Sequence, residues 1–454
     1  MISGGAALVA LLLHPIPAAA EVPVFRMGLE ETLEAALASS ERLRAAEHDV
    51  AAARERASAM GGLLWPRVSV DASWRYVSEV PAMSLVPGRP AVDFGAHRNW
   101  SVGPAASWTV WDWGSSYFAW TGAKAAADAK AEEAALVRRQ VRLNASASYA
   151  GVQMALETVR LLANSVNLAA TQYADISMRL ANGSASRLDV LQAHQDVFAR
   201  QREYAAARTA LGAALQDLFD LCGISATAWD SSFPADPATA QAPPADTPAA
   251  TLVAALDSID SSVAAVEAAA ARAVPDPAHP SVASLARAAK ASRKTSQGIL
   301  ASNLPAITVA GKVTREYPNG PVLEQINQNT VVLAASLPLF EGGRRRKLRR
   351  EQQEQAAAFE ERRDGAVADL ARDWRKAKDA VASLKVQRDA DRRAASEAAE
   401  LARLTYDAYR NGQARLIEVQ GANLRALQVR VQEARTKAEM LVQFAMIRSL
   451  AKEE

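Results

Sequence analysis

The chain has 454 residues, a formal net charge of only +2 and one cysteine. Its bulk charge therefore does not attract nucleic acid, and it cannot build a disulfide framework or a cysteine-based metal site within one chain. Long alanine-rich stretches with little Gly or Pro, and only 6% aromatic residues, indicate long helices that pack closely. We interpret the lone Cys222 as a small buried side chain of such a helix.

The N-terminus has the pattern of a secretion signal. An apolar run from Ala6 to Pro17 precedes three alanines, Ala18 to Ala20, that suit a signal peptidase. The run is too short to cross a membrane as a helix, and no later segment has about 20 uninterrupted apolar residues. We expect a signal peptide at residues 1–20, with no lipid anchor because no cysteine is near. The mature chain is then periplasmic, secreted, or a β-barrel of the outer membrane.

A helix and two strands follow the signal. Helical spacing of apolar residues predicts a helix from Leu29 to about Leu63, and Pro66 ends it. Apolar and polar residues then alternate along 68–76 and 100–110. Runs of about ten residues have the length of a tilted strand that crosses a bilayer, although alternation fits any half-buried sheet. The stretch 81–95 between them contains Pro and Gly and is predicted to be a loop.

Aromatic residues gather where the second strand passes into the next helix. They are Trp108, Trp111, Trp113, Tyr117 and Trp120. Such a cluster resembles the aromatic belt at a membrane–water interface. The alternative is a small aromatic core at a domain junction. Together with the signal peptide, the cluster favours a membrane sheet.

Two long helices close this part of the chain. Residues 115–179 contain no Pro and little Gly, and a helix of that length reaches about 100 Å. Its partner covers about 187–221. Helices this long find no globular core, so we expect coiled-coil packing. Asn182 and Gly183 predict a tight turn between them, with the glycine as a left-handed cap.

The same order of elements occurs twice. An offset of 229 residues carries Trp108 to Gly114 onto Leu337 to Gly343, Asn182-Gly183 onto Asn411-Gly412, and Asp189 onto Glu418. We predict two structural repeats, residues 21–230 and 251–454, joined by a linker at 231–250 that is rich in Pro, Ala and Asp. The second repeat is predicted to contain helices at 282–303, 344–410 and 416–451 and strands at 307–314 and 331–339.

Four strands per chain predict an oligomer. Four strands cannot close on themselves, and an open edge in lipid leaves backbone groups without hydrogen-bond partners. Two chains would supply eight strands and three would supply twelve, and strand counting does not choose between them.

Several motifs in this order carry a family resemblance. They are the duplicated hairpin, the strand entries Trp65-Pro66 and Leu304-Pro305, the segment Leu337 to Gly343, and the turn motifs 182–193 and 409–422. Over its mature length the chain resembles the TolC-type outer-membrane efflux proteins. The resemblance implies a mostly α fold with a membrane β-barrel portion. It implies a homotrimer that closes a 12-stranded barrel in the outer membrane of a Gram-negative cell. Long antiparallel coiled-coil helices would form a tunnel through the periplasm.

The resemblance also implies a gate at the helix turns. In this family an Asp six residues after the first turn glycine pairs with a Tyr three residues before the second, here Asp189 and Tyr409. Three copies of Glu418 would narrow the pore and favour cations. Ala414 replaces the family's locking Arg, and Arg415 is the candidate substitute. The alternative for Asp189 and Glu418 is ordinary charge at a helix N-terminus.

The resemblance further implies docking to a periplasmic adaptor protein and an inner-membrane pump, of the ABC or the proton-driven type. The residues expected to touch the adaptor are Asn182, Gly183, Leu188, Val190, Asn411, Gly412, Ile417 and Val419.

No pattern predicts an enzyme. The five histidines do not pair at metal-ligand spacing, and no phosphate loop or nucleophile elbow occurs, so no catalytic residue, cofactor or metal is expected. The basic run 344–350 starts a helix beside the membrane strands, where it can meet outer-membrane lipid head groups and neighbouring acids, so a solvated or interfacial face is favoured over nucleic-acid binding.

The cargo is the least determined feature. The absent lipid anchor favours an exit duct for type I protein (toxin) secretion. The alternative is a channel for multidrug or small-molecule efflux with a proton-driven pump. A periplasmic coiled-coil scaffold with a soluble cap is a distant third.

Overall fold

The computed structural model describes residues 28–83, 92–93, 95–224, 257–320 and 322–452. The predicted signal peptide and linker lie outside these residues, as does part of the predicted loop 81–95. Across the described residues, none of the helices has the length and apolar character needed to span a bilayer. The described residues divide into two compact units, which we call the sheet unit (36–83, 92–93, 95–144, 268–320, 322–383 and 443–452) and the turn unit (28–35, 145–224, 257–267 and 384–442).

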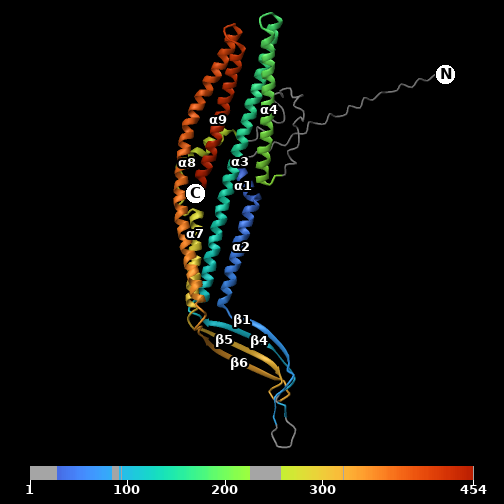
Figure 1. Ribbon diagram of the computed structural model, residues 1–454, viewed down its shortest axis with the longest axis vertical. Helices are drawn as coiled ribbons and strands as arrows, with labels where there is room; N and C mark the ends of the chain where they lie inside the picture. The colour runs from blue at the N-terminus through green and yellow to red at the C-terminus, as the bar shows by residue number, and fades with distance from the viewer. Residues whose placement is uncertain (1–27, 84–91, 94, 225–256, 321, 453–454) are drawn as a thin grey trace, which may run out of the picture. The chain divides into compact units, whose positions relative to one another are not determined.

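The sheet unit contains an antiparallel sheet of four long strands. They are β1 (Arg67–Tyr76), β4 (Arg98–Trp111), β5 (Ala306–Tyr317) and β6 (Ile326–Ser336). Their order is β1-β4-β5-β6, so the two predicted hairpins lie side by side and β4 pairs with β5 (Figure 1). A two-stranded extension, β2 (Ala82–Met83) with β3 (Val92–Asp93), adds short strands where a loop was predicted.

The last strand ends earlier than predicted. The apolar alternation extends to Leu339, but β6 ends at Ser336. Pro338 has no N–H to donate to a strand ladder, which is a physical reason for the ladder to stop before it. The residues from Leu337 to Phe340 therefore form a connection between the strand and the next helix.

The sheet has one apolar face and one polar face. Opposed residues share a face, and Trp74 lies opposite Trp100 while Val309 lies opposite Leu333. On the other face Ser73 lies opposite Ser101, with 2.9 Å between their hydroxyl oxygens, and Lys312 lies opposite Thr330. The apolar face is bare: Val70 is 74% exposed and Leu333 is 73% exposed. The alternation predicted from sequence is thus a real division between the two faces.

Both long helices begin with the same unusual turn. Trp113 and Gly114 have φ of 56° and 82°, and Gly342 and Gly343, 229 residues later, have φ of 60° and 78°. Trp113 is the only described non-glycine residue with positive φ, a conformation that costs L-residues energy. Its indole Nε1 donates to Pro305 O at 3.0 Å, which fastens the strained residue to the start of β5.

The helices follow the prediction closely, with two corrections. The expected single helix from Leu29 to Leu63 is instead α1 (Leu29–Ser39) and α2 (Glu41–Gly61), followed by the short 3-10 helix η1 (Gly62–Leu64), because Ser40 caps α2 by accepting from Leu43 N. A helix that was not predicted, α6 (Ile259–Arg272), precedes α7 (Pro280–Ala301). The long helices are α3 (Ser115–Ala181), α4 (Arg187–Cys222), α8 (Arg344–Arg410) and α9 (Leu416–Leu450).

A buried polar cluster holds the chain's C-terminal helix end in the sheet unit. Arg139 pairs with Asp276 at 2.8 Å, and its guanidinium also donates to Ser449 O and Ala451 O. Arg139 and Asp276 are 9% and 6% exposed. Burial, and then the charge of Arg139, lower the pKa of His279, so that its neutral ring caps α7 by accepting from Ser281 N. One arginine thus ties α3, the α6–α7 connection and the end of α9 together.

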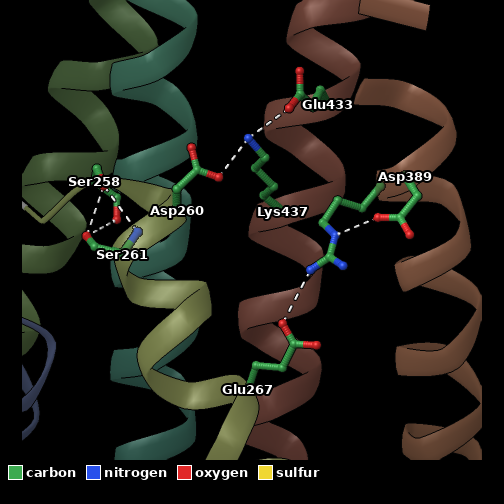
Figure 2. Close-up of polar contacts among 8 residues, drawn as sticks. Ser258, Asp260, Ser261, Glu267, Asp389, Glu433 and Lys437 are labelled. Atoms are coloured by element: carbon green, nitrogen blue, oxygen red, sulfur yellow. Dashed lines mark hydrogen bonds and ion pairs between the residues drawn. The ribbon is translucent and has the colours of Figure 1, made fainter. Parts of the chain in front are cut away.

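In the turn unit, charged side chains hold α6 against α8 and α9. Lys437 lies between Asp260 and Glu433, with both contacts at 2.8 Å, and Glu267 pairs with Arg388 at 3.3 Å (Figure 2). Burial acts to lower the pKa of Lys437, but its hydrogen bonds to Asp260 and Glu433 outweigh it and raise that pKa. Cys222 is buried as predicted, and burial raises the pKa of its thiol to about 11.

The contrast between two neighbouring arginines gives a stability prediction. Arg139→Met leaves the Asp276 carboxylate buried without its partner and should destabilise the protein by about 3–5 kcal/mol. Arg138→Met is the matched control, because Arg138 pairs with Glu47 at 3.2 Å on the surface, with side chains 50% and 53% exposed, and should cost no more than about 1 kcal/mol. Thermal unfolding followed by circular dichroism measures both. Equal shifts of the midpoint would show that the buried pair is not special.

Candidate functional site

The turns that join α3 to α4 and α8 to α9 have the same backbone geometry. Gly183 has φ of 73° and Gly412 has φ of 72°. Ser184 N donates to Arg179 O at 2.8 Å, and the equivalent Gln413 N donates to Ala408 O at 2.9 Å. The left-handed glycine cap expected from the sequence therefore closes both helices. With Asn182 and Asn411, these glycines are exposed at the turns.

Asp189 and Glu418 both cap the helices that follow the turns. Ser186 and Asp189 form a reciprocal capping box at the start of α4, and the Asp189 carboxylate accepts from Ser186 N and Oγ. In the second turn Arg415 stands at the position of Ser186. Its backbone N–H donates to Glu418 at 3.3 Å, so half of the box remains. The Arg415 side chain is exposed. Helix capping, the alternative raised for both acids, is thus present.

The residues expected to touch an adaptor divide into an outer and an inner set. Leu188 and Ile417 occupy equivalent positions and are 63% and 61% exposed. Two residues further on, Val190 is half-buried and Val419 is fully buried. Val419 belongs to a small core with Ile176, Ala193 and Leu416, onto which Val190, Tyr406 and Tyr409 pack. Leu188 and Ile417 therefore offer apolar surface, whereas Val419 stabilises the turn from inside.

Tyr409 lies close to Asp189, but their expected pairing stays a prediction. Burial, and then the negative charge of Asp189, raise the pKa of the Tyr409 phenol. The hydrogen bonds given above for the Asp189 carboxylate go to Ser186. Within one chain the two side chains thus affect each other electrostatically while the carboxylate serves the helix cap.

A second tyrosine, Tyr406, joins the helix pair α8–α9 to the helix pair α3–α4 by a direct hydrogen bond. The Tyr406 hydroxyl donates to Asp175 at 2.8 Å, and Arg179 donates to the same carboxylate at 3.1 Å. Arg179 also donates to Arg410 O at 3.1 Å. The end of α3 is thus joined to the end of α8 by a carboxylate shared between a phenol and a guanidinium.

Sequence reasoning missed this cluster. Tyr406 and Asp175 are not related by the 229-residue offset, so comparison of the repeats does not reveal them. The signal that could have found them is position: each lies about two turns before a turn glycine, on the helix that enters the turn. Two more contacts join the helix pairs, from Asn423 to Gln172 at 3.0 Å and from Gln420 to Gln192 O at 3.1 Å.

The predicted interface aromatics lie at the end of the sheet where the helices begin. Trp108, Trp111, Trp113 and Tyr117 are between 42% and 53% exposed, and Trp120 is half-buried. The Trp108 indole donates to Leu64 O at 3.0 Å, as Trp113 does to Pro305 O. The indole N–H groups of Trp108 and Trp113 are thus satisfied while much of each ring is uncovered. The location of the cluster at a membrane–water interface stays a prediction.

No metal site accompanies these features in the described residues, where no group of three or more His, Cys, Asp or Glu side chains could hold an ion.

Comparisons with known proteins give a consistent result. The family model described as outer membrane efflux protein matches residues 32–224 and 249–451. No curated protein matches the chain.

Solved structures share the fold. The structure of CusC, described in terms of folding and transmembrane channel formation, has 17% identity and a TM-score of 0.71, and the match covers 97% of this chain and 96% of that one. The outer membrane protein VceC from Vibrio cholerae has 15% identity and a TM-score of 0.72, covering 93% and 95%. The CmeC outer membrane channel of Campylobacter jejuni has 14% identity and a TM-score of 0.72, covering 94% and 87%.

The Tyr406–Asp175 contact predicts an unusual phenol. Burial, and then the hydrogen bond with Asp175, raise the pKa of Tyr406 to about 12. A raised pKa means that the stability gained from the neutral phenol is complete below about pH 10 and is lost as pH rises through about 12. Tyr406→Phe should remove one phenol that titrates near pH 12 from the absorbance titration at alkaline pH.

Asp175→Asn is the control for the cause of this shift. It keeps Tyr406 buried but removes the negative charge, so the pKa of the phenol should fall while staying above that of a free tyrosine. An unchanged high-pH step in Tyr406→Phe would mean that Tyr406 is not the perturbed group.

Proposed function

The chain belongs to the outer membrane efflux protein family, and from that premise we propose that three copies form the exit duct of a tripartite system for small-molecule efflux. Members of this family are outer-membrane channels and not enzymes. The observation that carries the proposal is the open sheet with one bare apolar face and one polar face.

The edges of the sheet support assembly from several chains. In the described residues β1 and β6 each pair on one side only. Their free backbone groups would be costly in lipid, because no water is there to satisfy them. Pairing β6 of one copy with β1 of the next removes both edges, and three copies give a closed sheet of twelve strands. The apolar face would meet lipid and the polar face, with Asp71, Arg75 and Lys312, would line the pore.

The bare apolar face also argues against the periplasmic scaffold. Val70, Val331 and Leu333 are 74%, 80% and 73% exposed, and contiguous apolar surface of this kind is rare on soluble proteins. If the sheet were a soluble cap, another protein surface would have to cover its apolar face.

Small-molecule efflux is a better-supported function than the type I protein secretion expected from the sequence. The matching family is described by efflux, which supports the alternative of a small-molecule channel working with a proton-driven pump.

We assign the partner contacts to the turns. The exposed Leu188 and Ile417 are apolar anchors for a periplasmic adaptor protein, which would join the duct to an inner-membrane pump. Because the two residues are equivalent in the repeats, a trimer would present six similar sites. The hydrogen bonds around Asp175 are of a strength, about 1–3 kcal/mol each, that a docking partner can overcome.

The cargo proposal is tested in a Gram-negative host that lacks its own outer-membrane channel. Supplied with a proton-driven pump and its adaptor, the protein should lower the accumulation of a fluorescent dye. Leu188→Asp/Ile417→Asp should abolish this effect, whereas Leu401→Asp, an exposed position on α8, is the control. Restored secretion of a type I toxin without any dye efflux would contradict the proposal.

Assembly is tested separately. The protein from outer-membrane fractions should migrate as a trimer that dissociates on heating. A soluble monomer would reject the channel.

Glu418 gives a prediction about ion selectivity. Three carboxylates around a narrow pore focus negative potential, so Glu418→Gln should lower the cation-to-anion permeability ratio in planar bilayers by about a factor of two or more. Glu439→Gln is the control, because Glu439 lies on the same helix and is paired with Arg435 at 3.0 Å. Equal ratios for wild type and Glu418→Gln would remove Glu418 from the constriction.

A further inference from the structure

The start of α8 is strongly basic and follows bare apolar residues. Six of the seven residues from Arg344 to Arg350 are Arg or Lys. Just before them, Leu339 and Phe340 are 88% and 89% exposed. The segment 339–350 therefore combines two apolar side chains, a glycine turn and a cationic helix start.

The chain's own acids neutralise only part of this charge. Arg345 pairs with Glu341 at 2.8 Å and also donates to the backbone oxygen of Ser302. Arg344 lies 3.9 Å from the same Glu341 carboxylate. Arg346 and Lys347 are exposed and form no ion pair with any described residue. Two adjacent cations are thus left for a partner outside the chain.

The fold does not need these cations. The offset of 229 residues places Arg344–Arg350 on Ser115–Thr121, which carries no charge. Both segments have the same left-handed turn before them, and both form the same helix start. Cations are also unfavourable there, because the N-terminal end of a helix is already positive. A charge cluster that opposes the helix dipole and is dispensable for the turn indicates an external anion.

The uncharged segment 115–121, which is equivalent to 344–350, carries aromatic residues instead. In the first repeat the matching positions hold Tyr117, Phe118 and Trp120 in place of Arg346, Lys347 and Arg349. Aromatic rings and basic side chains are the two kinds of residue that anchor proteins at a membrane surface. The two repeats therefore place different anchors at the same structural position.

We propose that Leu339, Phe340, Arg346 and Lys347 form a binding surface for anionic phospholipid headgroups on the periplasmic side of the outer membrane. The inference rests on the proposed function, because it takes the apolar face of the sheet as facing lipid. The two apolar side chains enter the edge of the acyl region. The two cations contact the phosphate.

The choice of lipid over other anions comes from the apolar pair. Free phosphate cannot interact favourably with the apolar side chains of Leu339 and Phe340. A phospholipid can, because it has an acyl chain as well as a phosphate. The first turn of α8 follows eight residues after the end of β6, and the cationic residues of one or two helical turns lie within about 10 Å of each other. That distance is comparable to the Debye length at physiological salt, so the cations act on one patch of the membrane surface.

The test uses the full-length trimer in vesicles, with its own tryptophans as reporters. Brominated phosphatidylglycerol or brominated phosphatidylethanolamine, mixed with the unbrominated zwitterionic lipid, quenches the indoles near the helix start, among them Trp111 and Trp113. The two quenching curves give the relative binding constant of the anionic lipid. Wild type should prefer phosphatidylglycerol about tenfold at low salt, with the preference falling as salt rises.

Two double variants isolate the site. Arg346→Gln/Lys347→Gln should lose most of the preference. Arg375→Gln/Lys376→Gln should keep it, because this exposed Arg-Lys pair lies on the same helix about 44 Å further along its axis. Equal preferences in the two variants, or no preference in wild type, would overturn the proposal.

Two further outcomes identify other partners and would also overturn it. Loss of the preference in millimolar inorganic phosphate at constant ionic strength would indicate a simple phosphate site. Dissociation of the Arg346→Gln/Lys347→Gln trimer would indicate that the cations pair with acids of a neighbouring copy. Single-channel conductance distinguishes failure of this proposal from failure of the proposed function. Wild-type protein that does not conduct would contradict the exit duct. Wild-type protein that conducts but shows no lipid preference would contradict only the lipid-binding surface.

Discussion

Backbone hydrogen bonding in the sheet stops at β1 and β6, and within the described residues nothing covers the apolar face between them. This one constraint governs what the protein can be. Water would leave a large apolar surface exposed, and lipid would leave two strand edges unsatisfied. Only a surrounding of lipid, together with pairing between copies, removes both costs. Membrane location and oligomer formation are therefore parts of the same physical solution.

Two turns connect this sheet to long helices, one between β4 and α3 and the other between β6 and α8. Each turn uses two consecutive left-handed residues, Trp113-Gly114 in one repeat and Gly342-Gly343 in the other. The first repeat accepts strain at Trp113 and recovers a hydrogen bond to Pro305 from its indole. The second repeat has glycine at both positions, which removes the strain, and basic residues at the start of α8. Equivalent backbones thus carry different chemistry, as expected when a duplicated unit keeps its fold and changes its surface.

Polar contacts add to the buried apolar residues in joining elements that are distant in sequence. Arg139 joins three segments of the sheet unit through Asp276 and two carbonyl oxygens, and Asp175 joins two helix ends in the turn unit through Tyr406 and Arg179. The two clusters differ in burial. Arg139 and Asp276 are almost completely buried, which suits a permanent joint, whereas Asp175 and Arg179 retain 28% and 22% exposure. Partly hydrated bonds are the ones that a docking partner can exchange.

The sequence by itself predicted the strand pattern and the long helices, because these depend on local periodicity and on turn glycines. It also located the helix turns to the residue, since Gly183 and Gly412 adopt a positive φ that glycine reaches without steric cost. Only the tertiary structure decided which side chains meet there. The Asp189 carboxylate caps its own helix, Val419 is buried in a small core, and the Tyr406 hydroxyl donates a hydrogen bond to Asp175. Such pairings depend on how separate helices pack together, and no spacing along a single helix records that.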